Sequence, residues 1–195
     1  MPKLVDHAER RERIAQALLA LVARDGLSGV SLRHVASEAG VTSGMVQHYF
    51  ASKDEMLSFA MQSAAVRYAS RIQASVEALG ADATPAATLR TVLANYIPQS
   101  DDELHDARIS LEFQSYAGGR ADLRGPLHEG ETQLIDWFTL LVAQAAGVAE
   151  SDASIRALGL FATAEGLGLK VVSTGLTPAD ALAALDAQLA LNGIR

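Results

Sequence analysis

The stretch SLRHVASEAGVTSGMVQHYFASKDEML, residues 31–57, carries the strongest structural signals in this 195-residue sequence. Ser31 is a favourable N-cap, and Gly40 ends the short helix that follows it. Thr42 or Ser43 then caps another short helix that runs to about Phe50. The stretch therefore predicts two short helices joined by a tight glycine turn.

Two such helices, supported by a preceding helix, make a helix-turn-helix. The second helix of this motif lies in the major groove of DNA and presents its N-terminal residues to the bases. Here Val41, Val46 and Phe50 supply a packing side, and polar residues occupy the rest of the helix. This uneven pattern is typical of a recognition helix, which needs one side for the core and one for the duplex.

The side chains expected at the DNA share hydrogen-bonding or phosphate-binding chemistry. Gln47 can read adenine with two hydrogen bonds, Gly44 lets the backbone approach closely, and Lys53 meets phosphate at the start of the next helix. The complete predicted set is Ser31, Arg33, Thr42, Ser43, Gly44, Gln47, His48, Tyr49 and Lys53. Lys3, Arg10 and Arg11 are further candidates, as a flexible basic arm. Each residue alone also fits an ordinary surface or core role, and any helical hairpin with a glycine can imitate the motif.

The remaining sequence predicts helices only, about nine in all. Apolar residues at helical spacing, Ile14, Ala17, Leu18, Leu21 and Val22, define a first helix that ends at Asp25-Gly26. After the helix-turn-helix, Ser52 caps a helix to about Leu79, and five more are expected near 84–97, 101–117, 120–146, 151–174 and 178–191. We expect an all-α fold with a helix-turn-helix DNA-binding domain at 1–50 and a helical ligand-binding and dimerisation domain at 51–195.

Composition and charge narrow the class of protein. The first 55 residues carry seven basic and seven acidic side chains, so the whole net charge of −7 comes from the rest of the chain. An N-terminal region with no net charge is compatible with DNA binding, because phosphate contacts depend on where the basic side chains lie. There are no cysteines, no histidine pair at metal-ligand spacing and no phosphate-binding glycine loop, so neither an enzyme, a metal site nor a cofactor is expected. With no signal peptide and no membrane-spanning run, a cytoplasmic protein that does not enter a membrane is expected.

The block from Arg11 to Leu57 resembles the DNA-binding domain of the TetR family of transcriptional regulators. The similarity rests on a helix ending in "DG", the run SLRHVASEAGV, and the run SGMVQHYFASKDEML at matching spacing. The VQHYF variant looks like the BetI-type branch, and the C-terminal run EGLGLKVVSTGLTPADALAALDAQLALN resembles it more loosely. Many members have a tyrosine where this chain has Gln47, and that tyrosine commonly touches phosphate. Gln47 therefore either reads a base or contributes less affinity.

The resemblance implies a homodimer with a ligand-sensing body. The helices near 151–174 and 178–191 would form the dimer interface, and Gly159, Gly166 and Gly168 would allow close helix approach. The alternative is that the apolar helix near 151–174 is buried within one subunit. A pocket between the fourth and eighth helices would be lined by Phe59, Tyr96, His105, Phe113, Tyr116, Trp137, Phe138 and Phe161, with Glu112, Gln114 and Gln133 nearby. Each of these aromatic residues also fits an ordinary core position.

Together these patterns predict a ligand-responsive regulator. It would repress by binding a pseudo-palindromic operator in double-stranded DNA as a dimer, and a small apolar or amphipathic effector of unknown identity would release it. The alternative is a DNA-binding regulator without a small-molecule ligand, which responds to a protein partner or acts constitutively.

Overall fold

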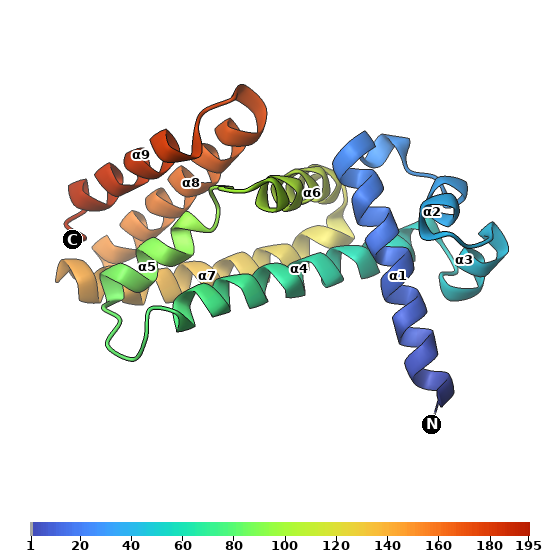
Figure 1. Cartoon of the computed structure of the whole chain (residues 1–195). Helices are drawn as coiled ribbons and strands as arrows, with labels where there is room; N and C mark the ends of the chain where they lie inside the picture. Colours follow the sequence, from blue (N-terminus) through green and yellow to red (C-terminus); the bar gives the residue numbers. More distant parts are fainter. Residues whose placement is uncertain (1) are drawn as a thin grey trace. The chain divides into compact units, whose positions relative to one another are not determined.

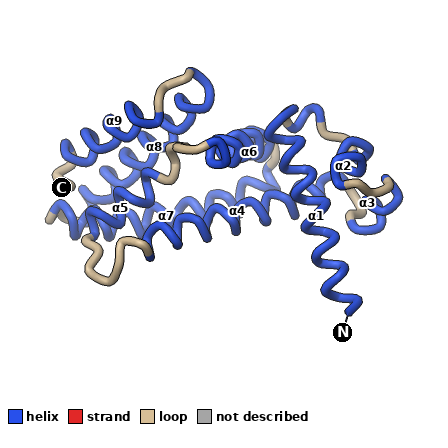
Figure 2. Tube along the Cα trace, in the orientation of Figure 1, coloured by secondary structure: helices blue, strands red, loops and turns tan. Residues whose placement is uncertain are grey.

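The described part of the chain is built from helices and loops. We analysed a computed structural model in which the backbone is described for residues 2–195 and the side chains for residues 7–120 and 128–195. Nine α-helices and one short 3-10 helix make up its regular structure, and no strand occurs within that range (Figure 2). The all-α prediction is confirmed.

The helices follow the chain in the order labelled in Figure 1. Their bounds are α1 Pro2–Asp25, η1 Leu27–Gly29, α2 Leu32–Ala39, α3 Ser43–Tyr49, α4 Lys53–Glu77, α5 Pro85–Ala94, α6 Asp101–Gly118, α7 Ala121–Ala146, α8 Glu150–Thr174 and α9 Pro178–Leu191. Most of these bounds agree with the sequence prediction to within one or two residues, because the helices begin at local caps. The Thr84, Ser100 and Thr177 hydroxyl oxygens each accept a backbone N–H three residues ahead, at 3.1, 3.3 and 3.1 Å.

One helix is shorter than its apolar pattern suggests. The sequence predicts a helix near 84–97, whereas α5 ends at Ala94 and residues 95–97 form turns. Pro98 disfavours helical backbone at Ile97, which precedes it, and Ile97 is nevertheless fully buried. The apolar periodicity therefore reported burial beyond the end of the helix.

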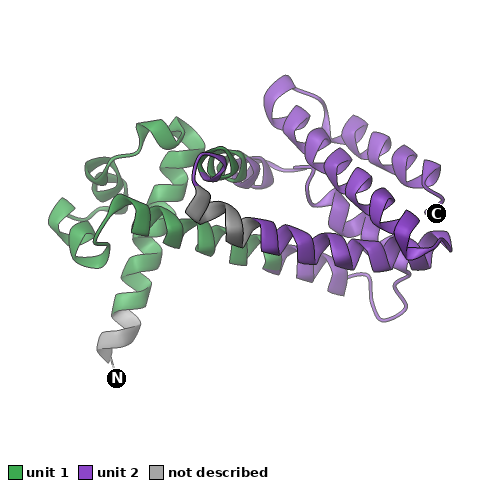
Figure 3. Cartoon of the chain, turned by 180° about the vertical axis from the view of Figure 1, so that it is seen from behind, with its two compact units in different colours: residues 1–69, 108–116 green, residues 70–107, 117–195 purple. Residues whose placement is uncertain are grey.

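The chain forms two compact units (Figure 3). Unit 1 comprises residues 1–69 and 108–116, and unit 2 comprises residues 70–107 and 117–195. These units are defined by how the chain packs, so they do not test the predicted functional boundary at residue 50. That boundary stays a prediction.

The core of unit 1 joins α1, α2, α3 and the start of α4. Leu18, Val35, Val46 and Phe50 are all at most 1% exposed. The same cluster includes Ile109 and Phe113, which come from α6, far along the sequence.

The core of unit 2 is formed by α5, α7, α8 and α9, with Leu93, Phe138 and Leu160 among its buried residues. Here α8 passes so close to the segment after α5 that a Cβ at Gly168 would overlap the Tyr96 carbonyl oxygen. Glycine is therefore required at this position by close packing.

Candidate nucleic-acid interface

Local hydrogen bonds fix the geometry of the helix-turn-helix in unit 1. The Ser31 hydroxyl oxygen accepts the His34 N–H at 3.2 Å at the start of α2. Gly40 ends α2 in the left-handed region at φ 65°, which a residue with a side chain rarely adopts. Thr42 caps α3 by accepting the Met45 N–H at 3.2 Å. Of the two caps that the sequence left open, Thr42 is therefore the one used.

The exposed residues of α3 include most of the predicted DNA contacts. Ser43, Gly44, Gln47 and His48 are exposed, as is the cap residue Thr42. Val46 on the opposite side is fully buried, and Phe50 follows it into the core. The structure thus leaves free the side of α3 that the sequence assigned to DNA, while the contacts themselves stay predictions.

Gly44 is a small residue that the fold does not demand. It lies outside the positive-φ region, and an added Cβ would meet only the Thr42 hydroxyl oxygen, at 3.9 Å. Because glycine weakens a helix relative to alanine, packing within unit 1 gives no reason for it. Close approach by another molecule does give a reason.

Tyr49 takes part in an aromatic group at the C-terminal end of α3. Its ring is half-buried and lies edge-on to the rings of His7, with centroids 4.7 Å apart, and of His48, 5.3 Å apart. Tyr49 therefore also packs α3 against α1, a role that its DNA assignment did not include.

Lys53 is tied to the loop that precedes α2. Its ammonium donates to the Val30 carbonyl oxygen at 2.8 Å. An ammonium has three donors, so this bond leaves capacity for a phosphate. Ser52 caps α4 by accepting the Glu55 N–H at 3.0 Å, and the Glu55 carboxylate accepts the Ala51 N–H at 2.8 Å. Ser52 and Glu55 thus form a slightly shifted capping box at the start of α4, and the bond to Val30 holds the Lys53 side chain at the loop before α2.

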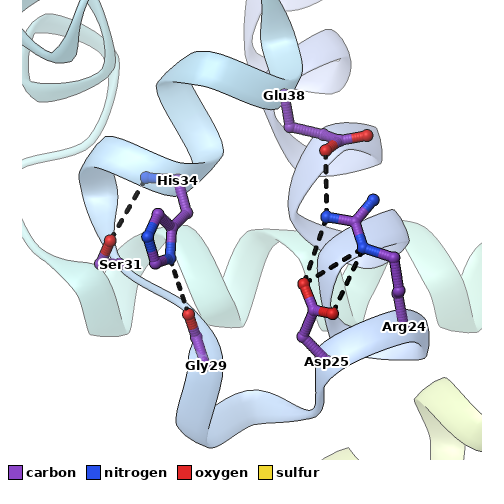
Figure 4. Close-up of polar contacts among 6 residues, drawn as sticks. All are labelled: Arg24, Asp25, Gly29, Ser31, His34 and Glu38. Carbon is purple, nitrogen blue, oxygen red and sulfur yellow. Dashed lines mark hydrogen bonds and ion pairs between the residues drawn. The ribbon is translucent and has the colours of Figure 1, made fainter.

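Further polar contacts of His34 and Arg24 tie α2 to the preceding loop and to α1 (Figure 4). The His34 Nδ1 lies 2.9 Å from the Gly29 carbonyl oxygen, and because a carbonyl only accepts, Nδ1 carries the hydrogen. Arg24 bonds to Glu38 and Asp25, and these bonds raise the pKa of its guanidinium above the usual value. The charge of Arg24 is thus already paired with carboxylates of unit 1. Arg33 is exposed on α2, as its predicted phosphate contact requires.

The prediction of a flexible basic arm is wrong for Arg10 and Arg11, since both lie within α1. The Arg11 guanidinium sits 4.6 and 4.7 Å from the ring centres of Phe50 and Phe59 and pairs with Glu55 at 3.0 Å. Arg11 therefore braces α1 against α4. The side chain of Lys3 lies outside the described residues.

The predicted pocket residues fall in two different units. Phe59, Phe113 and Tyr116 belong to unit 1, where Phe113 is buried in the core and the Tyr116 hydroxyl donates to Asp54 at 2.8 Å. Glu112, predicted near the pocket, instead accepts the Leu27 N–H at 2.8 Å within unit 1. A pocket shared by the whole predicted set stays a prediction.

Unit 2 holds the rest of that set. Its aromatic members include Tyr96, Trp137, Phe138 and Phe161, and the Phe161 ring lies 5.0 Å from Tyr96 and 5.8 Å from Phe138. His105 and Gln133 are also in unit 2 and exposed, and the predicted neighbour Gln114, in unit 1, is exposed as well.

Glu165 on α8 is a titratable group that the sequence reasoning missed. Partial burial raises the pKa of its carboxyl above the ordinary value, and the nearby Glu131 carboxylate raises it further. The available signal was a lone acid within the apolar run FATAEGLGL. Two acidic groups, on α8 and α7, are thus electrostatically coupled in unit 2.

An apolar stripe runs along the exposed side of α8. Ile155, Leu158 and Leu169 are 74%, 54% and 47% exposed, at helical spacings of three and eleven residues. A Cβ at Gly159 or Gly166 would meet no neighbour within 4 Å. The alternative of a wholly buried helix is therefore wrong for this side of α8. Of the three α8 glycines predicted to allow close helix approach, Gly168 does so within the chain, whereas approach of a partner helix at Gly159 and Gly166 stays a prediction.

Within the described residues, no helix is long and apolar enough to span a bilayer, and no three potential metal-binding side chains come together.

A helix-turn-helix unit followed by a helical body defines a class of bacterial transcriptional regulators, and comparison with known proteins identifies the family. Residues 14–58 match the family described as "Bacterial regulatory proteins, tetR family", and residues 85–192 match "BetI-type transcriptional repressor, C-terminal". The chain belongs to the TetR family, with a BetI-type C-terminal region. It is accordingly a DNA-binding transcriptional regulator and not an enzyme, as the sequence predicted.

Relatives match along most of the chain. The regulator PksA of Bacillus subtilis is 30% identical over 176 residues, which span 87% of this chain and 82% of PksA. BetI of Burkholderia thailandensis is 32% identical over 185 residues, 95% of this chain and 92% of BetI.

Solved structures share the fold. A transcriptional regulator from Rhodococcus sp. Rha1 has a TM-score of 0.79 at 29% identity and covers 93% of this chain and 94% of its own. A regulator from Saccharomonospora viridis, solved in complex with choline, has a TM-score of 0.84 at 21% identity, with 96% and 99% covered.

Proposed function

We propose that this regulator represses transcription by binding a pseudo-palindromic operator as a homodimer, and that a small effector releases it. The observation that carries the DNA part is the exposed face of α3, which begins at the Thr42 cap and presents Ser43, Gly44, Gln47 and His48. Gln47 reads a base, while Lys53 and Arg33 contact phosphate. Such a protein works where the DNA is, so we place it in the cytoplasm.

The apolar stripe of α8 supports the dimer. The neighbouring helix α9 adds Leu191, which is 78% exposed, and association with a second copy would remove these apolar side chains from water. Gly159 and Gly166 leave room for a partner helix along this stripe. A twofold dimer sets two α3 helices about 34 Å apart, one turn of DNA.

Acidic and aromatic side chains in unit 2 support the proposal that the effector is amphipathic and carries a positive charge. Glu165 and Glu131 offer negative charge on α8 and α7, and Tyr96 and Phe161 are aromatic neighbours within the same unit. The choline complex of the Saccharomonospora viridis regulator is consistent with this class of ligand. Which of the predicted aromatic residues line the effector pocket stays a prediction.

The DNA part is tested by selecting bound sequences from a random duplex pool and measuring affinity at several salt concentrations. A palindromic motif should emerge, and binding should weaken steeply as salt rises. Gln47→Ala should change the base preference, whereas Lys53→Ala should weaken all sequences about equally and reduce the salt slope by about one. If the protein ignores every duplex at low salt, the proposal is refuted.

The dimer is tested by Ile155→Glu, which places a charge on the apolar stripe. We expect a monomer by light scattering and loss of operator binding at protein concentrations that saturate the wild type. Gln62→Glu adds the same charge on the exposed side of α4 in unit 1 and should leave the dimer intact. A dimeric Ile155→Glu protein would show that α8 is not the interface.

The effector is tested by titrating choline and a series of longer alkylammonium ions into the protein–operator complex. Release of DNA by a cation, reduced in Glu165→Gln, supports the proposal. If no small molecule in a broad library shifts operator affinity or the melting temperature, the alternative holds, and the chain is a regulator that responds to a protein partner or acts constitutively.

A further inference from the structure

The recognition helix α3 carries one large apolar side chain that the core does not take up. Met45 is 38% exposed, whereas Val46 beside it is fully buried. Among the side chains described for unit 1, Val66 on α4 is the other large apolar residue of this exposure, at 64%. Met45 was absent from the predicted DNA contacts, because sequence reasoning selected only polar side chains and glycine.

The geometry of α3 directs this side chain toward the end that meets DNA. Side chains on a helix lean toward its N-terminus and cover the preceding turn. Met45 is the third residue of α3, and its N–H donates to the Thr42 cap at 3.2 Å. Its side chain therefore covers the first turn, which in a helix-turn-helix is the part nearest the base edges.

Met45 and Gln47 flank the exposed face from opposite sides. Successive helical residues are about 100° apart, and buried Val46 lies between the two. Each is thus about 100° from the inward direction, on its own side of α3. Since they point to different sides, they should contact different base pairs.

The major groove offers one apolar group that suits Met45. Thymine presents its C5 methyl there, and apolar side chains read it by contact. Methionine is unbranched and polarisable, so it can adjust to such a group at the surface. Gly44 beside it carries no side chain that would hold the duplex away. We propose, building on the DNA-binding function above, that Met45 determines specificity by contacting a thymine C5 methyl in each half-site.

The test removes that methyl from the DNA and the side chain from the protein. In the selected operator, each thymine is replaced in turn, symmetrically in both half-sites, by deoxyuridine, which lacks only the C5 methyl. At one position the wild type should lose about fourfold in affinity per half-site, or about 15-fold in all, as expected for one apolar carbon. Met45→Ala should bind the normal operator more weakly and be indifferent to deoxyuridine at that position.

Two controls make the result specific. Val66→Ala removes the other exposed apolar side chain of unit 1 and should keep the wild-type response to deoxyuridine. Gln47→Ala should also keep it, because Gln47 lies on the other side of α3. Matching melting temperatures show that the variants are folded.

The inference is overturned if Met45→Ala and deoxyuridine give additive losses at every thymine, or if the half-site contains no thymine. Either outcome leaves the proposed DNA-binding function standing. Failure of that function would appear instead as a wild-type protein that binds no duplex.

Discussion

Replacing Gly44 with alanine should separate the stability of unit 1 from its DNA binding. Gly44 is the second residue of α3 and lies outside the positive-φ region, so alanine fits its backbone. The added Cβ would make one ordinary contact, 3.9 Å from the Thr42 hydroxyl oxygen. Alanine is more favourable than glycine within a helix by up to about 1 kcal/mol. The free energy of unfolding should therefore rise by up to that amount, a gain of ~2–4 °C in melting temperature.

The same methyl group should weaken operator binding. It would project from the exposed side of α3, where the proposed interface brings the duplex against the helix backbone. Inserting a methyl into a closely packed contact typically costs ~1–3 kcal/mol, so operator affinity should fall at least about fivefold per half-site. A more stable protein that binds DNA less well is not expected from a defect in folding.

Thermal melts followed by circular dichroism and operator titrations by fluorescence anisotropy measure the two effects. Gly130→Ala is the matched control, because Gly130 also lies within a helix and a Cβ there meets nothing within 4 Å. It should stabilise the protein without changing operator affinity. Wild-type affinity in a folded Gly44→Ala protein would refute the claim that the duplex approaches the backbone at this position.

Three further predictions concern the stability of each unit. Gly168→Ala should lower the free energy of unfolding by ~1–3 kcal/mol in denaturant titrations, because its Cβ overlaps the Tyr96 carbonyl; a neutral effect would contradict the packing of α8. Glu112→Ala should cost ~1 kcal/mol by removing the acceptor of the Leu27 N–H, and exchange of that amide should accelerate, whereas unchanged exchange would exclude this bond in solution. Glu165→Gln should stabilise the protein at neutral pH. Burial and Glu131 raise the pKa of Glu165 in the folded protein above its ordinary value, so the folded state is less stable once Glu165 is ionised. This stability is lost as the pH rises from the ordinary glutamate pKa through the folded value. Melts at pH 4 and pH 7 should show the gain only at the higher pH, and an equal gain at both would exclude ionisation as the cause.

Local signals made the helices predictable from the sequence. Ser31, Thr42 and Thr177 each cap a helix through a bond to an N–H three residues ahead, so a short window of sequence contains the cause. Gly40 marks the turn in the same way, through its backbone conformation. The polar, exposed residues of α3 followed from the same local pattern.

Contacts between distant residues were not predictable in this way. From the sequence Arg11 looks like a basic surface residue, but in the structure the centres of the Phe50 and Phe59 rings lie 4.6 and 4.7 Å from its guanidinium. Glu112 reads as a polar neighbour of a pocket until its bond to Leu27, 85 residues away, is seen. Such pairings depend on how later parts of the chain pack against earlier helices, and a single sequence taken by itself carries no record of that.

The inclusion of residues 108–116 in unit 1 has a consequence for protein engineering. Anyone who transplants the DNA-reading head of this chain onto another body by cutting at a single point would leave Ile109 and Phe113 behind, and with them part of the apolar centre that the head needs. A working hybrid requires two cuts, or a recipient whose own sixth helix supplies equivalent side chains. The DNA-binding region and the rest of the chain are thus harder to exchange between proteins than the order of motifs along the sequence suggests.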